Sequence, residues 1–229
     1  MLKKNYKNIF FSNSLTIPII ICLISAITFS ITVPNFSDLR NILNIFEQMG
    51  VLGFLAIGMT FVMISGGIDL SSYTAVSAAA VVGATIMVAT ESALLGSSVM
   101  LLVGLFFGTI NGIAIAYLKM IPFIVTLSTM VLAQGFAIWF TKAQSVYGLP
   151  DSLIDLITDR LFGYMPMPAI LIFIVAIISG FILRYTKMGR ELYLTGSNEH
   201  TAEISNINIK SSKFSVYLVS GLMAGITAI

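Results

Sequence analysis

The sequence predicts an all-α membrane protein, a polytopic transmembrane helix bundle of about seven spans with a cytoplasmic N-terminus. Three observations support this fold class. Hydrophobic residues make up 57% of the 229 residues and charged residues 10%, whereas a typical soluble domain carries about 25% charged residues. The mean hydropathy is +0.98. Apolar runs close to the ~20 residues that a helix needs to cross the hydrocarbon core recur along the chain. A soluble globular domain and a disordered chain are therefore excluded.

The N-terminal part of the chain predicts one span and one interfacial helix. An apolar run over residues 14–33 follows three lysines. This run is too long for the roughly 7–15 apolar residues of a signal peptide, so we expect an uncleaved first span. Residues 35–49 are more polar and repeat apolar side chains at helical spacing, which predicts a helix lying in the membrane interface. Cys22 stands alone and is expected to be a small buried hydrophobe.

The rest of the chain predicts six further spans. Residues 50–90 are apolar apart from a polar break at 65–72, and two spans fit only if this break lies at or just inside the membrane boundary. The remaining spans are expected at 94–118, 121–141, 169–183 and 214–229. Short turns separate them, except for two longer polar loops at 142–168 and 184–213. The apolar run at 214–229 has no polar flank, so we expect the chain to be the N-terminal part of a longer protein.

The distribution of basic residues sets the predicted orientation, because lysine and arginine concentrate in cytoplasmic loops. With the N-terminus inside, nine of the twelve basic residues fall in cytoplasmic segments and three in external ones. The cytoplasmic residues are Lys3, Lys4, Lys7, Lys119, Arg184, Lys187, Arg190, Lys210 and Lys213, and the external ones are Arg40, Lys142 and Arg160.

The sequence lacks the residue sets of catalysis, metal binding and nucleotide binding. It contains no G-x-x-x-x-G-K-[ST] loop for ATP. His200 and Cys22 are each the only residue of their kind, so no zinc site and no intramembrane Ser–His pair is expected. Asp69 is the only acid within the apolar stretches, which excludes a pair of catalytic carboxylates. We expect no enzyme, no metal and no cofactor in this chain, and the net charge of +2 does not favour nucleic acid as a partner.

Polar residues within the apolar runs are candidates for a substrate path. An acidic residue in or beside a span is costly and usually faces a bundle interior or a cavity. Gly66 and Gly67 permit a broken helix before Asp69, which either caps the next helix together with Ser71 or lines a translocation path. Each candidate is individually more typical of a hydrogen bond between helices. The predicted path residues are Asp69, Ser65, Asn111, Thr126, Ser128 and Gln134.

Two stripes of small residues predict close helix packing. Small residues every four positions let two helices approach without bulky side chains between them. The alternative is that they leave a lumen for solute. The stripes are Gly104, Gly108 and Gly112 on one helix and Ala75, Ala79 and Gly83 on another.

The polar segment 184–213 predicts a folded loop on the cytoplasmic side. It carries five basic and three acidic residues. Ser197 or Asn198 can cap a short helix that runs through Ser205, and Asn206 tolerates the left-handed turn that ends such a helix. The segment either docks a cytosolic partner or is a structured loop without one.

Four motifs, taken in order, resemble segments of the ribose-type ABC importer permeases. Residues 64–71 (I-S-G-G-I-D-L-S) resemble the G-G-I-D-L-S segment of that family, and residues 111–117 and 122–127 resemble its N-G and P-x-F-I-V-T-L segments. Ser72 and Tyr73 stand where members of the family commonly have valine and glycine, and Asn206 stands where they usually have glycine. The residues similar to the cytoplasmic coupling loop of the family are Gly189, Arg190, Tyr193, Gly196, Ser197, Asn198, Ala202 and Ser205.

The resemblance implies one permease domain over residues 1–229, the N-terminal part of such a protein, with a coupling loop at 184–213. It implies import of a monosaccharide such as ribose, xylose or galactose, or of a related furanose signal, by alternating access. The implied partners are a second permease subunit in a homodimer or heterodimer, a cytosolic ABC ATPase that uses the ATP, an extracytoplasmic solute-binding protein and the lipid of a bacterial inner membrane. The residues implied in coupling to the ATPase are Gly189, Arg190, Gly196, Asn198, Glu199, Ala202 and Ser205.

Other functions remain open on the sequence. A branched-chain amino acid or nucleoside ABC permease has a similar architecture, because the binding protein usually decides the solute. An autonomous secondary transporter or channel needs buried charges for ion coupling, and Asp69 is the only acidic residue within the apolar stretches that could provide one. A membrane scaffold or sensor without a transport role is a further possibility.

Overall fold

The computed structural model describes residues 15–161 and 165–229, which fall into two compact units. The first unit ends at Ile45 and the second runs from Phe46 to Ile229. Nearly all of the regular structure is helical, so the predicted all-α class is confirmed. Three lysines used for the orientation, at positions 3, 4 and 7, lie outside the described residues, as does the start of the predicted first span at residue 14.

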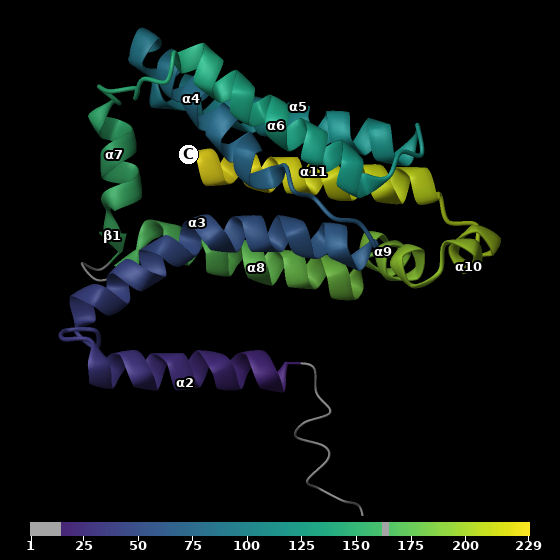
Figure 1. The fold of residues 1–229 in the computed structure, drawn as a ribbon, viewed down its shortest axis with the longest axis horizontal. Helices are drawn as coiled ribbons and strands as arrows, with labels where there is room; N and C mark the ends of the chain where they lie inside the picture. The colour runs from purple at the N-terminus through teal and green to yellow at the C-terminus, as the bar shows by residue number, and fades with distance from the viewer. Residues whose placement is uncertain (1–14, 162–164) are drawn as a thin grey trace, which may run out of the picture. The chain divides into compact units, whose positions relative to one another are not determined.

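The first unit contains helix α2, Thr16–Thr32, at the position of the predicted first span (Figure 1). Its sequence is apolar on all sides and none of its residues is buried, which is typical of a helix that faces lipid. Cys22 is exposed on this helix, so the expectation of a buried thiol is wrong. The reason is that a bilayer is itself apolar, and an apolar side chain there has no need of a protein interior.

Helix α3, Leu39–Ile64, is continuous over 26 residues. The predicted separate interfacial helix at 35–49 is therefore wrong, because its helical spacing of apolar residues continues into the next span without a helix breaker. Gly50 and Gly53 do not interrupt α3 and instead allow a close neighbour. A Cβ on Gly50 would lie 2.6 Å from Pro168, and one on Gly53 would lie 2.6 Å from Ile172.

Each of the seven predicted spans coincides with a helix in the described part of the chain. Among these described helices, five are long and apolar enough to cross a membrane, namely α3, α4, α5, α6 and α8. The protein is thus a multi-pass α-helical membrane protein. The bounds in the second unit are α4 Ser72–Thr90, α5 Ala93–Ala116, α6 Pro122–Thr141, α8 Met167–Tyr185 and α11 Ile209–Ala228.

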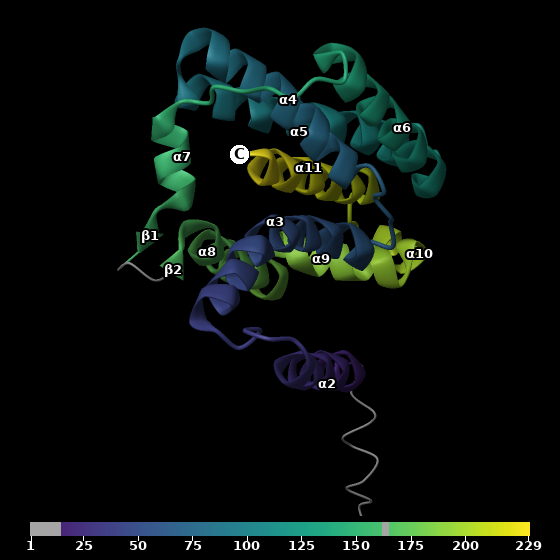
Figure 2. The ribbon, with the colours of Figure 1, turned by 60° about the vertical axis from the view of Figure 1, so that its left-hand side comes forward.

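Short elements occupy the two segments that the sequence predicts as polar loops. The first holds α7, Asp151–Thr158, and two paired antiparallel strands, β1 Arg160–Leu161 and β2 Met165–Pro166. The second holds α9, Lys187–Ser197, and α10, Glu199–Ile204. Within the second unit, α9 and α10 lie at one end of the bundle and α7 lies at the other (Figures 1 and 2).

The bundle is held together by direct contact between helix backbones. Gly104 and Gly108 of α5 face Gly221 and Gly225 of α11, and a Cβ on Gly104 would lie 2.6 Å from the backbone nitrogen of Gly225. The view in Figure 2 shows α11 lying along α5. The packing interpretation of this glycine stripe is confirmed, because α11 fills the space that a lumen would need.

The alanine and glycine stripe on α4 also packs against α5. A Cβ on Gly83 would lie 2.8 Å from the carbonyl oxygen of Gly96, and Ala75 and Ala79 are buried. Small residues on both sides are needed at this crossing because the two backbones come within van der Waals distance. The helices that carry the polar residues are therefore fixed at short range to one another.

Candidate functional site

A sharp break between α3 and α4 forms the centre of the candidate site. Gly66 has a φ of +81°, a conformation that glycine adopts without strain, and the backbone N–H of Gly67 donates to the carbonyl of Val62 at 3.0 Å. A Cβ on Gly67 would lie 2.6 Å from the hydroxyl oxygen of Tyr217. The first glycine therefore supplies the turn and the second lets α11 approach it.

Asp69 follows the break and is 4% exposed. Its Oδ1 accepts the backbone N–H of Ser71 at 2.9 Å and the hydroxyl of Ser71 at 2.6 Å. Its Oδ2 accepts the hydroxyl of Ser220 on α11 at 2.6 Å. Asp69 thus bonds to Ser71, the residue just before α4, and fastens the break to α11, but it accepts no N–H from within α4. Ser71 makes no capping bond of its own to α4.

The polar contacts continue from Ser71 into two more helices. The side-chain amide of Asn111 on α5 donates to the hydroxyl oxygen of Ser71 at 2.7 Å, and the hydroxyl of Thr129 on α6 lies 2.7 Å from Asn111 Oδ1. Asn111 is 1% exposed and Thr129 is 4% exposed. We call these linked side chains the Asp69 network; its members are Asp69, Ser71, Asn111, Thr129 and Ser220.

The structure divides the predicted path residues into two groups. Four are buried at or near the break, namely Asp69, Ser65, Asn111 and Thr126. Ser65 donates to the carbonyl of Val62 at 2.8 Å, and Thr126 donates to that of Pro122 at 2.9 Å while lying 3.4 Å from the carbonyl oxygen of Ile68. The other two, Ser128 and Gln134, are exposed on α6 and lie apart from the network.

Three members of the network are absent from the predicted path residues: Ser71, which the sequence predicts only as a helix cap, Thr129 and Ser220. Thr129 lies three residues after Thr126 and so shares a helix face with it. This spacing could have added Thr129 to the predicted path residues. Ser220 is one hydroxyl within the apolar run of α11, and nothing in its local sequence points to a partner 151 residues away. Ser220 reaches Asp69 because α11 packs against the break between α3 and α4.

The predicted cytoplasmic loop is a compact pair of helices with the expected caps. Asn198 accepts the backbone N–H of Thr201 at 3.1 Å at the start of α10, so the predicted short helix and one of its two candidate caps are confirmed. Asn206 has a φ of 60°, as expected for the turn after it. Helix α9 was not predicted; Thr186 caps it by accepting the N–H of Gly189 at 3.4 Å.

This two-helix segment is seated firmly on the bundle. A Cβ on Gly196 would collide with the carbonyl oxygen of Ile64, the last residue of α3, and a Cβ on Gly189 would collide with that of Leu183 on α8. Leu192 of α9 is 0% exposed and belongs to one apolar cluster with Phe61 of α3 and Tyr217 of α11. Helix α9 is therefore in direct contact with the end of α3, next to the break.

The residues expected to couple to an ATPase serve two different roles in this segment. Gly189, Gly196 and Ala202 pack it: the glycines by close backbone approach, and Ala202 by full burial. The polar members, which are exposed and available to a partner, are Arg190, Asn198, Glu199 and Ser205.

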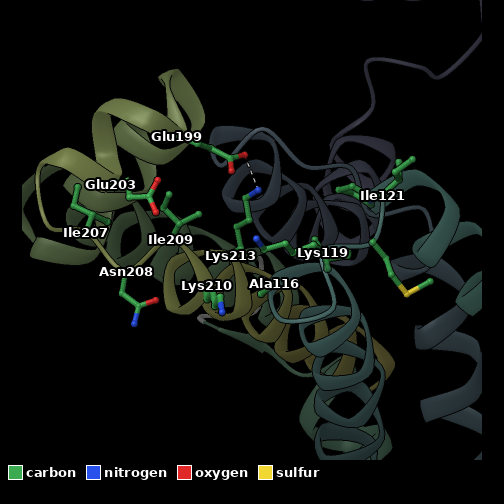
Figure 3. A pocket seen from close by; sticks show the side chains of 13 residues that line it. Ala116, Lys119, Ile121, Glu199, Glu203, Ile207, Asn208, Ile209, Lys210 and Lys213 are labelled. Carbon is green, nitrogen blue, oxygen red and sulfur yellow. Dashed lines mark hydrogen bonds and ion pairs between the residues drawn. The ribbon is translucent and has the colours of Figure 1, made fainter.

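A cleft of about 590 Å³ lies beside this segment, between the α5–α6 turn and the link from α10 to α11 (Figure 3). Its lining carries both signs of charge, and Lys213 Nζ lies 2.6 Å from Glu199 Oε1. Such a lining can bind the charged groups of a protein partner. Its charged members are Lys119, Lys210, Lys213, Glu199 and Glu203.

The fold and the site define a multi-pass membrane protein in which a folded, partly exposed loop, formed by α9 and α10, packs against the break between α3 and α4. A family model described as "Branched-chain amino acid transport system / permease component" matches residues 41–229, and the chain belongs to this family.

Curated relatives of this chain are named as sugar permeases. The ribose import permease protein of Haemophilus influenzae is 34% identical over 86% of this chain and 62% of its own length. The D-allose transport system permease protein of Escherichia coli is 31% identical over 92% of this chain and 64% of its own length. The L-arabinose ABC transporter permease protein of Azospirillum brasilense is 29% identical over 92% of this chain and 62% of its own length. The chain thus spans less than two thirds of the length of these relatives, and no solved structure matches it.

Proposed function

We propose that the chain is a transmembrane permease subunit of an ABC importer, and that it passes a monosaccharide across a bacterial inner membrane by alternating access. Its sequence relatives carry the names of ribose, allose and arabinose permeases, which favours a pentose or hexose as the solute. A separate ATPase uses the ATP, a solute-binding protein delivers the sugar outside, and a second permease subunit completes the path. The chain itself performs no catalysis.

One observation carries the mechanism: the close contact between α9 and the end of α3, where Gly196 meets the carbonyl of Ile64. An ATPase that pushes on the exposed residues of α9 and α10 moves the broken helix with them. The Asp69 network then carries this movement from the break to α5, α6 and α11, because one member comes from each. Solute contact is assigned to Ser128 and Gln134, which have free surface, and the buried network positions the helices.

The proposed orientation places α9 and α10 in the cytoplasm and the N-terminus on the same side. Basic residues gather around this end of the second unit. Lys119, Lys210 and Lys213 line the cleft beside α10, and Arg184 and Arg190 line a pocket at the junction of α8 and α9. Such a concentration of positive charge is typical of the cytoplasmic side.

The function is tested by sugar uptake in a strain that lacks the gene encoding this chain. We expect the deletion to abolish saturable uptake of one of radiolabelled ribose, allose, arabinose, xylose or galactose, and the intact gene to restore it. Leucine uptake in the same cells is the control. Loss of leucine uptake with unchanged uptake of every sugar would instead support a branched-chain amino acid permease. Sugar uptake driven by an ion gradient without an ATPase would support a secondary transporter.

A second readout of the same strains tests the partner. The complete protein, purified in mild detergent, is expected to retain an ABC ATPase, and Arg190→Glu is expected to remove it because Arg190 is exposed on α9. The exposed Lys142 lies outside α9 and α10, so Lys142→Glu serves as the matched charge reversal and should leave the ATPase bound. Equal retention by both variants contradicts docking at this segment.

A further inference from the structure

A second pocket, of about 680 Å³, lies where α8 ends and α9 begins. It differs from the cleft in Figure 3 because its lining carries charge of one sign. No carboxylate lines it, and both of its charged side chains are guanidinium groups. The lining residues are Gly180, Leu183, Arg184, Arg190, Tyr193 and Leu194.

The two arginines are free to meet an anion. The ion pairs of the described residues join Lys187 to Glu191 and Lys213 to Glu199, and neither includes Arg184 or Arg190. The guanidinium carbon of Arg184 lies 5.4 Å from the ring centroid of Tyr185, a contact that holds the side chain while leaving its N–H groups available. Planar guanidinium groups match the geometry of phosphate oxygens.

Exposed apolar side chains continue along α8 from the pocket toward the middle of the helix. Ile177, Gly180, Phe181 and Arg184 are spaced so that they share one face of the helix. Ile177 is 72% exposed and Phe181 is 58% exposed, in a helix apolar enough to span a bilayer. A Cβ on Gly180 would meet no heavy atom within 4 Å. Gly180 therefore leaves open space on the helix face that also carries Arg184, beside the apolar side chains of Ile177 and Phe181.

We propose that this pocket binds an anionic phospholipid. The headgroup phosphate contacts Arg184, and one acyl chain fills the gap at Gly180 and lies against Ile177; Arg190, which the proposed function assigns to the ATPase, adds positive charge at the rim. A free phosphate would match the arginines alone, whereas a lipid matches both the positive rim and the apolar stripe. Basic pockets at the membrane boundary recognise anionic headgroups in this way. The proposal does not depend on which solute the protein transports.

The test measures lipid retention by the complete protein in mild detergent, using native mass spectrometry with added phosphatidylglycerol or phosphatidylcholine. We expect phosphatidylglycerol to be retained in preference. Arg184→Gln should reduce its occupancy about fivefold, the effect of one basic residue near an anionic headgroup. Gly180→Leu should reduce it similarly by filling the gap while leaving every charge in place.

Matched controls separate these effects from general damage. Lys187→Gln removes a charge whose side chain is 83% exposed and which is paired with Glu191, and Gly135→Leu adds the same side chain at another glycine that has nothing within 4 Å. Both should retain wild-type occupancy. The proposal is overturned if Arg184→Gln retains phosphatidylglycerol as well as the wild type does, or if inorganic phosphate displaces the lipid completely. It is also overturned if the variants lose the ATPase while lipid occupancy stays unchanged.

Discussion

Replacing Asp69 with alanine is expected to lower the free energy of unfolding by about 3 kcal/mol or more, because it breaks a buried hydrogen-bonded network. The substitution removes the acceptor of three hydrogen bonds, two from Ser71 and one from Ser220. Both hydroxyls are buried, so water cannot replace the carboxylate. Thermal unfolding of the complete protein in detergent, followed by circular dichroism, measures the effect.

Two further substitutions show whether the hydrogen bonds or the charge of Asp69 are responsible. Asp69→Asn keeps an acceptor for Ser71 and offers an N–H to the hydroxyl oxygen of Ser220, so it should recover most of the lost stability. Ser220→Ala should cost about 1–3 kcal/mol, because it leaves Asp69 Oδ2 without its donor. Ser128→Ala is the control, since that exposed hydroxyl bonds only within its own helix. If Asp69→Ala is no more harmful than Asp155→Ala at an exposed site, the network does not support the fold.

Replacing Gly108 with alanine is expected to force α5 and α11 apart. The added Cβ would collide with the carbonyl oxygen of Tyr217 and lie 3.0 Å from the Cα of Gly221. Both are backbone atoms, so no side-chain rotation relieves the contact and a whole helix must shift. We expect a loss of about 3 kcal/mol, the upper part of the range for overpacking in a close-packed interior. The sugar uptake that we propose should fall with it, because Ser220 on α11 moves away from Asp69.

The same substitution at Gly135 provides the control for Gly108→Ala. Gly135 also lies inside a helix that can span the membrane, but a Cβ there meets nothing within 4 Å. Alanine should be neutral at that position or stabilise the helix by up to about 1 kcal/mol, because glycine is a poor helix former. Thermal unfolding of Gly108→Ala and Gly135→Ala under the same conditions measures the difference in stability between the two variants. Equal melting temperatures would show that α5 and α11 can separate without cost.

The length of the apolar runs was sufficient to predict where the long apolar helices of this protein lie. It succeeded because a membrane helix needs an apolar run of a nearly fixed length. It failed at α3, where an amphipathic segment and a fully apolar one form a single helix, since the sequence contains no stop between them. It also missed α9, although Met188, Leu192 and Thr195 recur at helical spacing and could have predicted a short amphipathic helix.

The candidate site was only partly predictable, because a helix pattern does not say which neighbour covers which face. Asp69 and Asn111 stood out as polar residues in apolar surroundings, and the structure places both in one network. Ser128 and Gln134 stood out in the same way, yet they lie on the exposed side of α6. Ser220 could not be found from sequence, because its partner is set by the crossing of α11 over the break.

The single hydroxyl hydrogen of Ser71 gives the network a direction. Since Ser71 donates to Asp69, its oxygen can only accept from Asn111, and the Asn111 amide must therefore turn its nitrogen toward Ser71 and its oxygen toward Thr129. These dipoles align with their positive ends toward the carboxylate, and Ser220 adds another from the opposite side. Aligned dipoles strengthen one another in a medium of low dielectric constant. They replace the hydrogen bonds that water would otherwise make to Asp69, so the polar atoms of this side chain are satisfied inside the bundle.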